Sequence, residues 1–251
     1  MEKPTILVTN DDGIFSPGIA ALAHELTTIG DVWVFAPDKE QSAVGHGISL
    51  NRPLRTREIQ PQWHSIDGTP ADCVLLAVRQ LMPVKPDIVL SGINNGPNLG
   101  DDVTYSGTVA GAYEGMLLGF PSLAVSNASY DAREFDVVAK VATKIASQIL
   151  EFGLPEDTVL NLNVPQLPYE DLQGVAITRQ GLRNYGDEIF EREDPRGKKY
   201  YWIGGFREEH VIHDGTDFEA IEHDKVSVTP LHRNITNHES LSLMKNWNLT
   251  L

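Results

Sequence analysis

Two adjacent carboxylates, Asp11 and Asp12, follow the first apolar segment of the chain, at residues 5–9, and Gly13 closes the turn behind them. Ligands of open α/β sheets bind outside the carboxyl ends of the strands, so this pair lies where chemistry is usually done. The two charges repel each other, and a hard divalent cation such as Mg²⁺ would relieve that repulsion and be shared with a substrate phosphate. The alternative interpretation is a solvated turn, because Asp, Asn and Gly all favour turns.

Two further polar loops follow predicted strands. Ser42 lies in a loop after an apolar segment at residues 32–36, and Asn94 and Asn95 follow a segment at residues 87–91. Because the carboxyl ends of parallel strands share one edge of a sheet, these loops can converge on the acidic pair. Together they offer carboxylate, hydroxyl and carboxamide oxygens, which suit Mg²⁺, Mn²⁺ or Ca²⁺ better than zinc. The sequence therefore predicts a site for one hard divalent cation.

A predicted helix at residues 108–118 begins beside these loops, with Ser106 in the position of an N-cap. The free backbone N–H groups and the positive dipole end of a helix favour an anion. Ser106, Gly107 and Thr108 are therefore the predicted second phosphate-binding element. An ordinary helix cap is the alternative interpretation.

The elements that must position these residues alternate between strand and helix from residue 5 to about 126, as expected for βαβ units. Helix starts are marked at Ser16-Pro17 and at Thr69-Pro70, where an N-cap residue precedes proline. Residues 92–100 contain too many Gly, Asn and Pro residues for regular structure and are predicted to form a loop. The expected strands are residues 5–9, 32–36, 87–91, 121–126 and 158–164, and the expected helices start at Pro17, span about 70–82 and 108–118, and cover 135–152.

The character of the chain changes beyond about residue 173. Residues 185–196 are charged and predicted to be irregular, whereas residues 200–203 and 226–229 are predicted strands. We therefore divide the chain into an α/β domain at residues 1–172 and an extension at residues 173–251, which combines a hairpin or swapped arm with elements that close the core.

Composition excludes several classes of function. The 251 residues include 20 Lys and Arg against 35 Asp and Glu, for a net charge of −15, the opposite of the basic field that nucleic-acid binding needs. The start of the chain lacks a leader pattern, and no apolar run approaches the length of a membrane span. The single cysteine, Cys73, cannot form an intrachain disulfide and is predicted to be a small buried hydrophobe. We expect a cytoplasmic protein with neither a nucleic-acid nor a membrane partner.

Ordered motifs along nearly the whole chain resemble those of the SurE family of stationary-phase survival nucleotidases. They are Leu-Val-Thr-Asn-Asp-Asp-Gly at residues 7–13, Ala-Pro-Asp-Lys-Glu-Gln-Ser-Ala-Val-Gly-His at 36–46, Gly-Thr-Pro-Ala-Asp-Cys at 68–73, Ser-Gly-Ile-Asn-Asn-Gly-Pro-Asn at 91–98, Tyr-Ser-Gly-Thr at 105–108, Tyr-Trp-Ile-Gly-Gly at 201–205 and Val-Ser-Val-Thr-Pro-Leu at 226–231. The family usually carries an Asp soon after the last motif, whereas here Leu231 is followed by His-Arg-Asn-Ile-Thr.

The resemblance implies a Rossmann-like, three-layer parallel-sheet fold with a C-terminal β-rich extension used in oligomerisation, and hence a homodimer or homotetramer. It implies one divalent cation per subunit, Mg²⁺ or Mn²⁺, held by Asp11, Asp12, Ser42 and Asn94. Asn94 is chosen as the first Asn after Ser91-Gly92, and Asn95 and Asn98 are the less favoured candidates. The implied activity is a metal-dependent hydrolysis of nucleoside monophosphates, with 3′-nucleotides and short polyphosphate as further candidate substrates.

For the reaction we expect direct attack of activated water on the phosphoryl group. Asp11 and Asp12 would hold the cation, and one of them would orient the water. The predicted catalytic residues are Asp11, Asp12 and Asn94, and the predicted phosphate contacts are Asn10, Ser42, Asn94, Ser106, Gly107 and Thr108.

Two aromatic side chains near these motifs allow two interpretations each. His46 shares a loop with Ser42 and titrates in the range of a general acid, but a loop histidine more often fixes the backbone, which is the interpretation we favour. Tyr105 can stack on a nucleobase, although we favour a packing role.

Rival functions lack a required residue. A phosphatase that forms an aspartyl phosphate needs Asp-x-Asp after the first strand, where this chain has Asn10-Asp11-Asp12. A receiver-like signalling or nucleotide-binding module that binds Mg²⁺ without hydrolysis remains the alternative, but its phospho-accepting Asp is replaced by Ser91-Gly92. The Gly-x-Gly-x-x-Gly spacing of dinucleotide-binding enzymes is missing.

Overall fold

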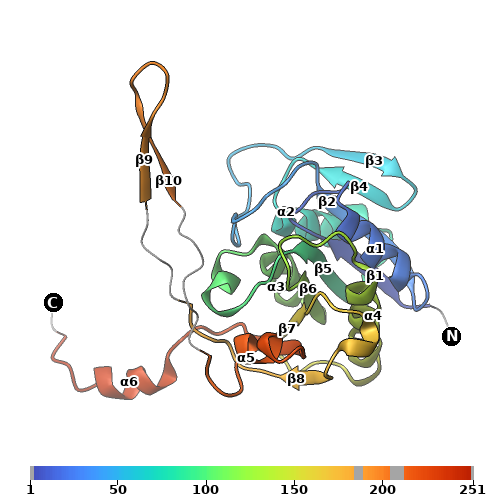
Figure 1. Ribbon diagram of the computed structural model, residues 1–251. Helices are drawn as coiled ribbons and strands as arrows, with labels where there is room; N and C mark the ends of the chain where they lie inside the picture. Colours follow the sequence, from blue (N-terminus) through green and yellow to red (C-terminus); the bar gives the residue numbers. More distant parts are fainter. Residues whose placement is uncertain (1–2, 184–188, 204–211, 250–251) are drawn as a thin grey trace.

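The computed structural model describes residues 3–183, 189–203 and 212–249, and it contains a nine-stranded sheet in the order β3-β4-β2-β1-β5-β6-β7-β11-β8 (Figure 1). Six neighbouring strands are parallel to one another, and β3 and β11 pair antiparallel with β4 and β7 at either side of that set. The parallel strands are β1 (Thr5–Thr9), β2 (Asp31–Pro37), β4 (Trp63–Ile66), β5 (Ile88–Asn95), β6 (Ser122–Asn127) and β7 (Thr158–Val164). The remaining strands of this sheet are β3 (Thr56–Gln60), β8 (Val175–Ile177) and β11 (Val226–His232).

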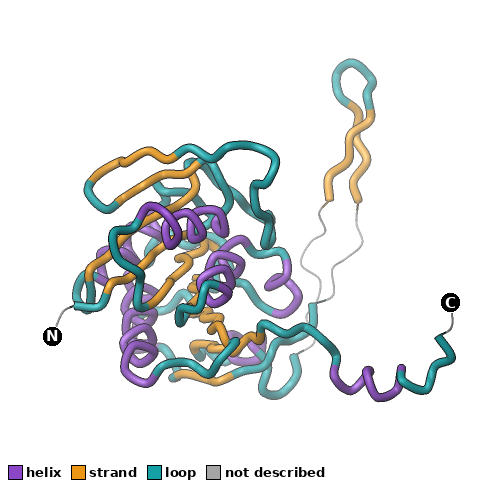
Figure 2. The backbone as a smooth tube through the Cα atoms, turned by 180° about the vertical axis from the view of Figure 1, so that it is seen from behind, coloured by secondary structure: helices purple, strands orange, loops and turns teal. Residues whose placement is uncertain are grey.

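Helices cover both faces of the sheet, which gives the three layers of the predicted α/β fold (Figure 2). Helices α1 (Pro17–Leu26) and α4 (Asp136–Phe152) pack together on one face, and α2 (Pro70–Leu76) and α3 (Gly107–Leu117) pack together on the other. The predicted helix starts are confirmed: Ser16, Thr69 and Ser106 are N-caps whose side chains accept backbone N–H groups of the first turn. Asp72 completes a capping box with Thr69.

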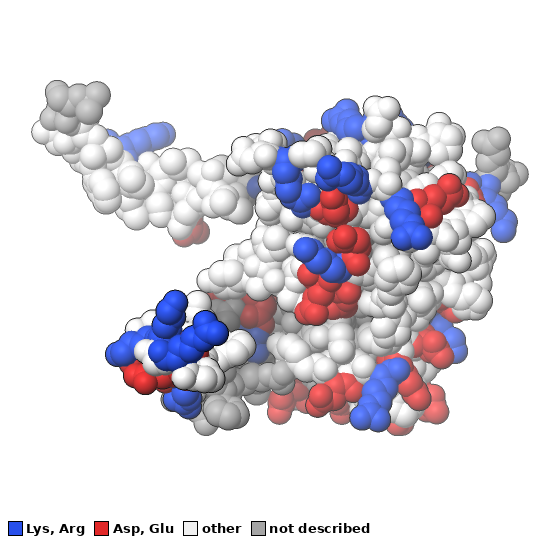
Figure 3. Space-filling model, turned by 90° about the horizontal axis from the view of Figure 1, so that it is seen from above, with Lys and Arg blue, Asp and Glu red and all other residues white. Residues whose placement is uncertain are grey.

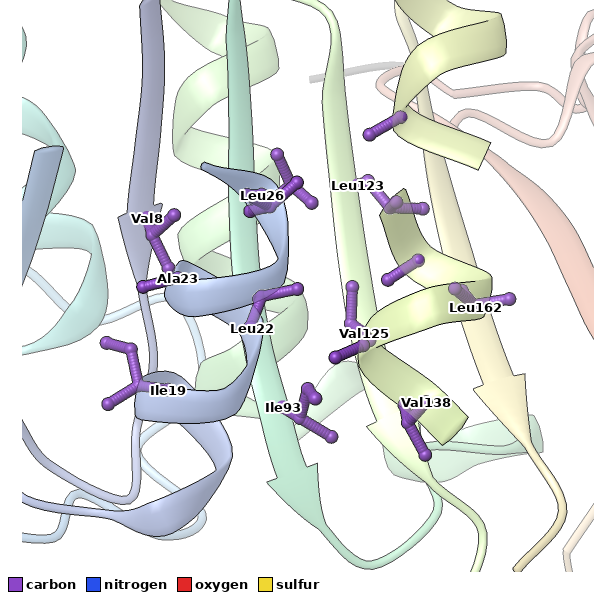
Figure 4. Close-up of a cluster of buried hydrophobic side chains, with 14 of the residues drawn as sticks. Val8, Ile19, Leu22, Ala23, Leu26, Ile93, Leu123, Val125, Val138 and Leu162 are labelled. Atoms are coloured by element: carbon purple, nitrogen blue, oxygen red, sulfur yellow. The ribbon is translucent and has the colours of Figure 1, made fainter. Parts of the chain in front are cut away.

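The hydrophobic core between the sheet and helices α1 and α4 consists mainly of aliphatic side chains. Leu22 and Leu26 of α1 point toward Val125 and Leu123 on the sheet, and Val138 of α4 lies over the same strands (Figure 4). All of these side chains are buried, at most 2% exposed. On the opposite face, Cys73 is fully buried in a smaller cluster with Phe35 and Val74, as predicted for a small apolar side chain.

Helix α3 approaches the sheet unusually closely because every fourth residue on its inner face is glycine. A Cβ atom on Gly107 would lie 2.8 Å from Cβ of Asp11, one on Gly111 would lie 2.7 Å from Oγ of Ser91, and one on Gly115 would lie 2.5 Å from Oγ of Ser122. No ordinary side chain fits at these distances. The spacing of i, i+4 and i+8 keeps the three glycines on one face of the helix, so the whole face lies directly on β1, β5 and β6.

The parallel strands change winding direction between β1 and β5. Strand β2, which follows β1 in sequence after α1, lies on one side of β1, and β5 lies on the other. In open α/β sheets, ligands bind at the carboxyl ends of the strands at such a switch point. Asp11 and Asp12 follow β1, and Asn94 lies at the end of β5, so the fold places both predicted motifs at this position.

The prediction of a loop at residues 92–100 is wrong for its first part, because β5 continues to Asn95. Asn94 and Asn95 pair with Ser126 and Asn127 of β6 after a register shift. Gly92 allows the close approach: its φ is +146°, and a Cβ there would lie 2.3 Å from the carbonyl O of Val125. Gly and Asn have low intrinsic propensity for strands, but here the pairing with β6 overrides that tendency.

Several further elements differ from the sequence prediction. The helix expected to about residue 82 ends at Leu76 and is followed by a π turn, η1 (Ala77–Leu81). The hairpin formed by β3 and β4 was not predicted, and neither were the short helices α5 (Asp217–Glu222) and α6 (His238–Met244). Residues 185–196 were expected to be irregular; residues 185–188 lie outside the described part, whereas β9 (Ile189–Glu193) is a regular strand.

The C-terminal part both extends the sheet and projects from it. The predicted strands at 226–229 and 200–203 are confirmed as parts of β11, in the main sheet, and of β10 (Lys199–Ile203), which forms a separate hairpin with β9. The hairpin and α6 stand away from the body of the molecule (Figure 1), and Lys and Arg side chains gather at the end of the hairpin (Figure 3). Residues 204 and 205 of the motif at 201–205 lie outside the described residues.

Asp217, the first residue of α5, ties the C-terminal part to the loop before α3. Its carboxylate accepts hydrogen bonds from the backbone N–H groups of Gly100 at 2.8 Å, Gly181 at 2.9 Å and Phe218 at 2.9 Å. The side chain is fully buried, and burial raises its pKa. One carboxylate thus joins three segments.

No helix in the described part of the chain is both long and apolar enough to cross a membrane.

We predict that Gly111→Ala destabilises the protein, although alanine is the better helix former by about 1 kcal/mol. The added Cβ would lie 2.7 Å from Ser91 Oγ and 2.9 Å from Thr9 Cγ2, and such overpacking costs about 1–3 kcal/mol. Urea unfolding should show a lower free energy of unfolding. Combining the change with Ser91→Ala, which removes the nearest atom, should recover part of the loss; a stability equal to or above that of the wild type in Gly111→Ala alone would contradict the close approach.

Candidate functional site

A cavity of about 510 Å³ opens at the carboxyl edge of the sheet, at the switch point between β1 and β5. Residues from four loops line it, and they include all four predicted metal ligands. The lining consists of Asp11, Asp12, Glu40, Ser42, Ala43, Asn94, Asn95, Pro97, Asn98, Asp102, Tyr105, Ser106 and Tyr130. The structure therefore brings the three separate motifs of the sequence to one place.

The acidic pair lies on the floor of this cavity, with Asp11 only 5% exposed. Asp11 Oδ1 accepts a hydrogen bond from the Thr108 hydroxyl, and Asp12 Oδ2 accepts one from the Asn95 backbone N–H at 3.3 Å. Burial raises the pKa of Asp11. Burial and, next, the charge of Asp11 raise the pKa of Asp12 from 3.8 to about 6. The two carboxylates are thus electrostatically strained when no positive charge accompanies them.

Ser42 and Asn94 present oxygen atoms to the same cavity. The loop that carries Ser42 is fixed by the backbone N–H of Gln41, which donates to the Asp11 carbonyl at 2.7 Å, and the Ser42 hydroxyl donates to Glu40 Oε1 at 2.6 Å. Asn94 donates from Nδ2 to the Gly96 carbonyl at 2.8 Å. Because the amide nitrogen is directed to that carbonyl, Oδ1 is the atom of Asn94 that remains to accept or ligate.

The donor set fits a hard divalent cation. The four predicted ligands offer only oxygen, and the described chain contains no cluster of three or more His, Cys, Asp and Glu residues such as a zinc site would use. None of the described residues that line the cavity is Lys, Arg or His. An anionic substrate would therefore meet only acidic and neutral side chains, and a cation is the group that would reverse the local charge.

Helix α3 begins at the cavity, but its first residues play different parts. Ser106 lines the cavity and caps the helix, since its Oγ accepts the backbone N–H of Val109 at 3.0 Å. Gly107 permits the contact with Asp11, and Thr108 donates to that carboxylate from below. Of the predicted phosphate-binding trio, only Ser106 lines the cavity, whereas Gly107 and Thr108 position Asp11.

The structure places Asn10 outside the lining of the cavity. This residue is fully buried and does not line the cavity. Its Nδ2 donates to the Gly13 carbonyl at 3.0 Å and to Ser16 Oγ at 2.8 Å. Asn10 therefore shapes the turn that carries the acidic pair and joins it to the start of α1. Its contact with phosphate stays a prediction.

His46 lies outside the cavity lining, on the outer side of α3. Its Nε2 is 2.9 Å from Glu114 Oε2, an ion pair when the imidazole is protonated, and its ring is tilted against Tyr113. This contact fastens the Ser42 loop to the helix. The geometry agrees with the backbone-fixing role that the sequence favoured over a general acid.

Two residues of the site were not found from sequence, and the structure adds contacts for a third, Asn98. Tyr130 and Asp102 line the cavity, and neither was a candidate. Asn98 was considered only as a ligand. Its backbone N–H donates to Asn163 Oδ1 at 2.8 Å and its Nδ2 to Ser126 Oγ at 2.8 Å, so it is anchored in a buried polar network beneath the cavity. In the sequence, the signal for this polar network was the repeated Asn in the predicted strand at 158–164, at positions 161 and 163.

Comparison with known proteins agrees with the arrangement of these motifs. The sequence model of the family described as "Survival protein SurE" matches residues 6–187. The chain belongs to the SurE family. The matched range includes all residues of the acidic pair, the Ser42 loop, the end of β5 and the start of α3, so every part of the cavity falls within the family region.

Full-length relatives show the same relationship. The protein named 5'-nucleotidase SurE from Geobacter sulfurreducens is 52% identical over 248 residues, which cover 98% of this chain and 94% of the relative. The protein of the same name from Pelobacter propionicus is 50% identical over 243 residues, 96% of this chain and 98% of the relative. The crystal structure of the SurE protein from Aquifex aeolicus superimposes with a TM-score of 0.87 at 49% identity and covers 96% of this chain and 98% of that one. The SurE fold predicted from sequence is confirmed.

We predict that Thr108→Val weakens cation binding about 10- to 100-fold while the fold is retained, because partners that hydrogen-bond a ligating carboxylate carry effects of this size. Calorimetric titration with Mn²⁺ would measure the dissociation constant. Thr143→Val in α4 is a matched control: Thr143 is likewise buried, but its hydroxyl has no hydrogen-bond partner among the described residues. Equal affinities in the two variants would contradict the role of Thr108.

We also expect the stabilisation by a divalent cation to depend on pH. The pKa of Asp12 is raised in the fold to about 6, so the unfolded chain releases this proton at lower pH than the folded chain does. Without a cation, ionisation of Asp12 therefore lowers the free energy of unfolding as the pH rises from about 4 through about 6. Mn²⁺ would offset this loss only when the carboxylate is charged. The rise in Tm caused by Mn²⁺ should therefore be larger at about pH 7.5 than at about pH 5.

The same measurement on Asp12→Asn supplies the control, because that variant lacks the titrating group. Its smaller response to Mn²⁺ should differ less between the two pH values. A wild-type Tm that rises equally at both pH values would contradict the electrostatic account of the pair.

Proposed function

We propose that this protein is a 5′-nucleotidase that hydrolyses nucleoside monophosphates to nucleoside and phosphate with the help of one divalent cation, Mg²⁺ or Mn²⁺. The observation that carries the proposal is the cavity at the switch point, where the buried Asp11 and the partly buried Asp12 lie near the N-cap of α3. None of the described lining residues is cationic. The relatives named 5'-nucleotidase SurE support the substrate class.

The cation would be held by Asp11, Asp12, Ser42 and Asn94. When bound, it supplies the positive charge that compensates the phosphoryl oxygens and favours attack by water. Asp11 is the more deeply buried of the pair and has Oδ1 engaged by Thr108. Asp12 is less buried, and within the described part of the chain its carboxylate accepts one long hydrogen bond, from the Asn95 backbone N–H. We therefore assign the orientation of the attacking water to Asp12.

The remaining residues bind and orient the ester. Ser106 stands at the start of α3, where the first backbone N–H groups of the helix have no partner within the helix and can donate to phosphate oxygens. Asn94 and Ser42 belong to the same lining. The phosphate would sit between these groups and the acidic pair. We extend the proposal to 3′-nucleotides and short polyphosphate, because these groups recognise the phosphate and not the position of the ester.

The exposed apolar residues of the C-terminal part support a proposed homodimer or homotetramer. Trp202 and Ile203 of the hairpin are 65% and 91% exposed, and Leu243 and Trp247 near α6 are 68% and 60% exposed. Apolar surface of this extent on projecting segments marks an interaction surface. We propose that a second copy of the chain covers it.

We predict that the wild-type protein releases phosphate from a panel of nucleoside 5′-monophosphates with Mn²⁺ or Mg²⁺ and loses this activity with a chelator. Asp12→Asn should retain the fold and lose at least about 100-fold in kcat, because it removes the group that holds the cation and orients water. Circular dichroism and phosphate release measure the two properties.

The matched control is Asp136→Asn, which changes an acidic residue at the start of α4, outside the cavity lining. Activity that survives complete removal of the cation would defeat the mechanism. A wild-type protein that binds nucleotides but hydrolyses no monoester would instead favour the receiver-like binding module.

A further inference from the structure

Two tyrosine side chains lie at the solvent-facing rim of the cavity. Tyr105 is 58% exposed and Tyr130 is 40% exposed, and both belong to the lining. The floor is buried by comparison, since Asp11 and Ser106 are 5% and 7% exposed. The cavity thus combines a polar, acidic floor with an aromatic rim, and the exposure of Tyr105 argues against the core-packing role favoured from sequence.

The backbone that carries Tyr105 is fixed beside the proposed phosphate position. Its carbonyl accepts the backbone N–H of Gly45 at 2.9 Å, and its own N–H donates to the carbonyl of Asp102 at 3.0 Å. The next residue is Ser106, the N-cap of α3. The ring of Tyr105 is therefore attached to a rigid segment one residue away from a proposed phosphate contact.

Tyr130 lies against the turn that follows β5. A Cβ on Gly96 would lie 2.7 Å from both Cδ1 and Cε1 of the Tyr130 ring, so glycine is needed for the ring to lie on this turn. The Gly96 carbonyl accepts from Asn94 Nδ2 at 2.8 Å. Tyr130 is thereby placed next to the segment that presents the proposed metal ligand Asn94.

We propose that Tyr105 and Tyr130 bind the nucleobase of the substrate by stacking, an inference that rests on the proposed nucleotidase function. The volume of about 510 Å³ lies within the range of ligand cavities, about 300–1,000 Å³, and leaves room for a nucleoside above the phosphate. With the phosphate on the buried floor, the base reaches the rim where the two rings lie. Stacking uses the π-face that every base has, so it favours a planar base without selecting one base over another.

The test compares two esters that share the 5-phosphate and differ in the base: adenosine 5′-monophosphate and ribose 5-phosphate. In Tyr105→Leu and Tyr130→Leu, the ratio of kcat/KM for the nucleotide to that for the sugar phosphate should fall about ten-fold each, chiefly through KM for the nucleotide. Tyr105→Phe and Tyr130→Phe keep the ring and should restore the ratio. Phe152→Leu, an exposed aromatic residue at the end of α4, is the matched control and should not change it.

A binding measurement without cation gives a second readout. The dissociation constant for adenosine, measured by calorimetry, should rise about ten-fold in each leucine variant. The stacking role would be overturned if the substrate ratio is unchanged in both leucine variants. It would also be overturned if the wild type shows no saturable adenosine binding, or if that binding is unchanged in the variants. Each of these results would leave the nucleotidase proposal intact. A wild-type protein that hydrolyses neither ester would count against the proposed function instead, and the adenosine titration would still decide the role of the tyrosines.

Discussion

The close contact between helix α3 and the sheet is the constraint on which the cavity depends. Gly107, Gly111 and Gly115 allow the helix backbone to lie where any larger side chain would collide with β1, β5 or β6. As a result the first turn of the helix reaches the acidic pair, and the Thr108 hydroxyl meets Asp11. A helix held farther away by alanine would separate the anion-binding end from the carboxylates. The distance between α3 and the sheet therefore determines the geometry of the cavity.

Electrostatics is the physical argument for the proposed cation. The chain carries a net charge of −15, and Glu40 and Asp102 join Asp11 and Asp12 in the cavity lining. Arg183 pairs with Asp102 and leaves the acidic pair itself without a cationic neighbour among the described lining residues. The pKa values of both carboxylates are raised, because burial destabilises their charged forms. The proposed divalent ion would offset that cost and would let an acidic cavity attract a phosphate.

Much of this arrangement could be predicted from sequence because it depends on local signals. Ser16-Pro17 and Thr69-Pro70 specify helix starts through caps, and Asp11-Asp12 at the end of an apolar strand indicates an edge of the sheet. Contacts between distant segments could not be predicted in this way. Asn10 has the composition of a site residue, but its amide is used by the turn. Tyr130 lies on the cavity only because Gly96, 34 positions earlier in the sequence, lacks a side chain. The assignment of Asp11, Asp12, Ser42 and Asn94 as metal ligands is a proposal that rests on the family resemblance and the geometry of the cavity.

The carboxylate of Asp217 makes the last third of the chain part of the same cooperative unit as the cavity. It accepts the N–H of Gly100, which begins the 3-10 turn η2 (Gly100–Thr104) that leads to Tyr105 and Ser106. Proteolytic removal of the chain beyond residue 212 would strip buried amide groups at Gly100 and Gly181 of their acceptor, a cost of about 1–3 kcal/mol for each. The segment that carries the rim would loosen, so a trimmed enzyme would be impaired at a place far from the cleavage point.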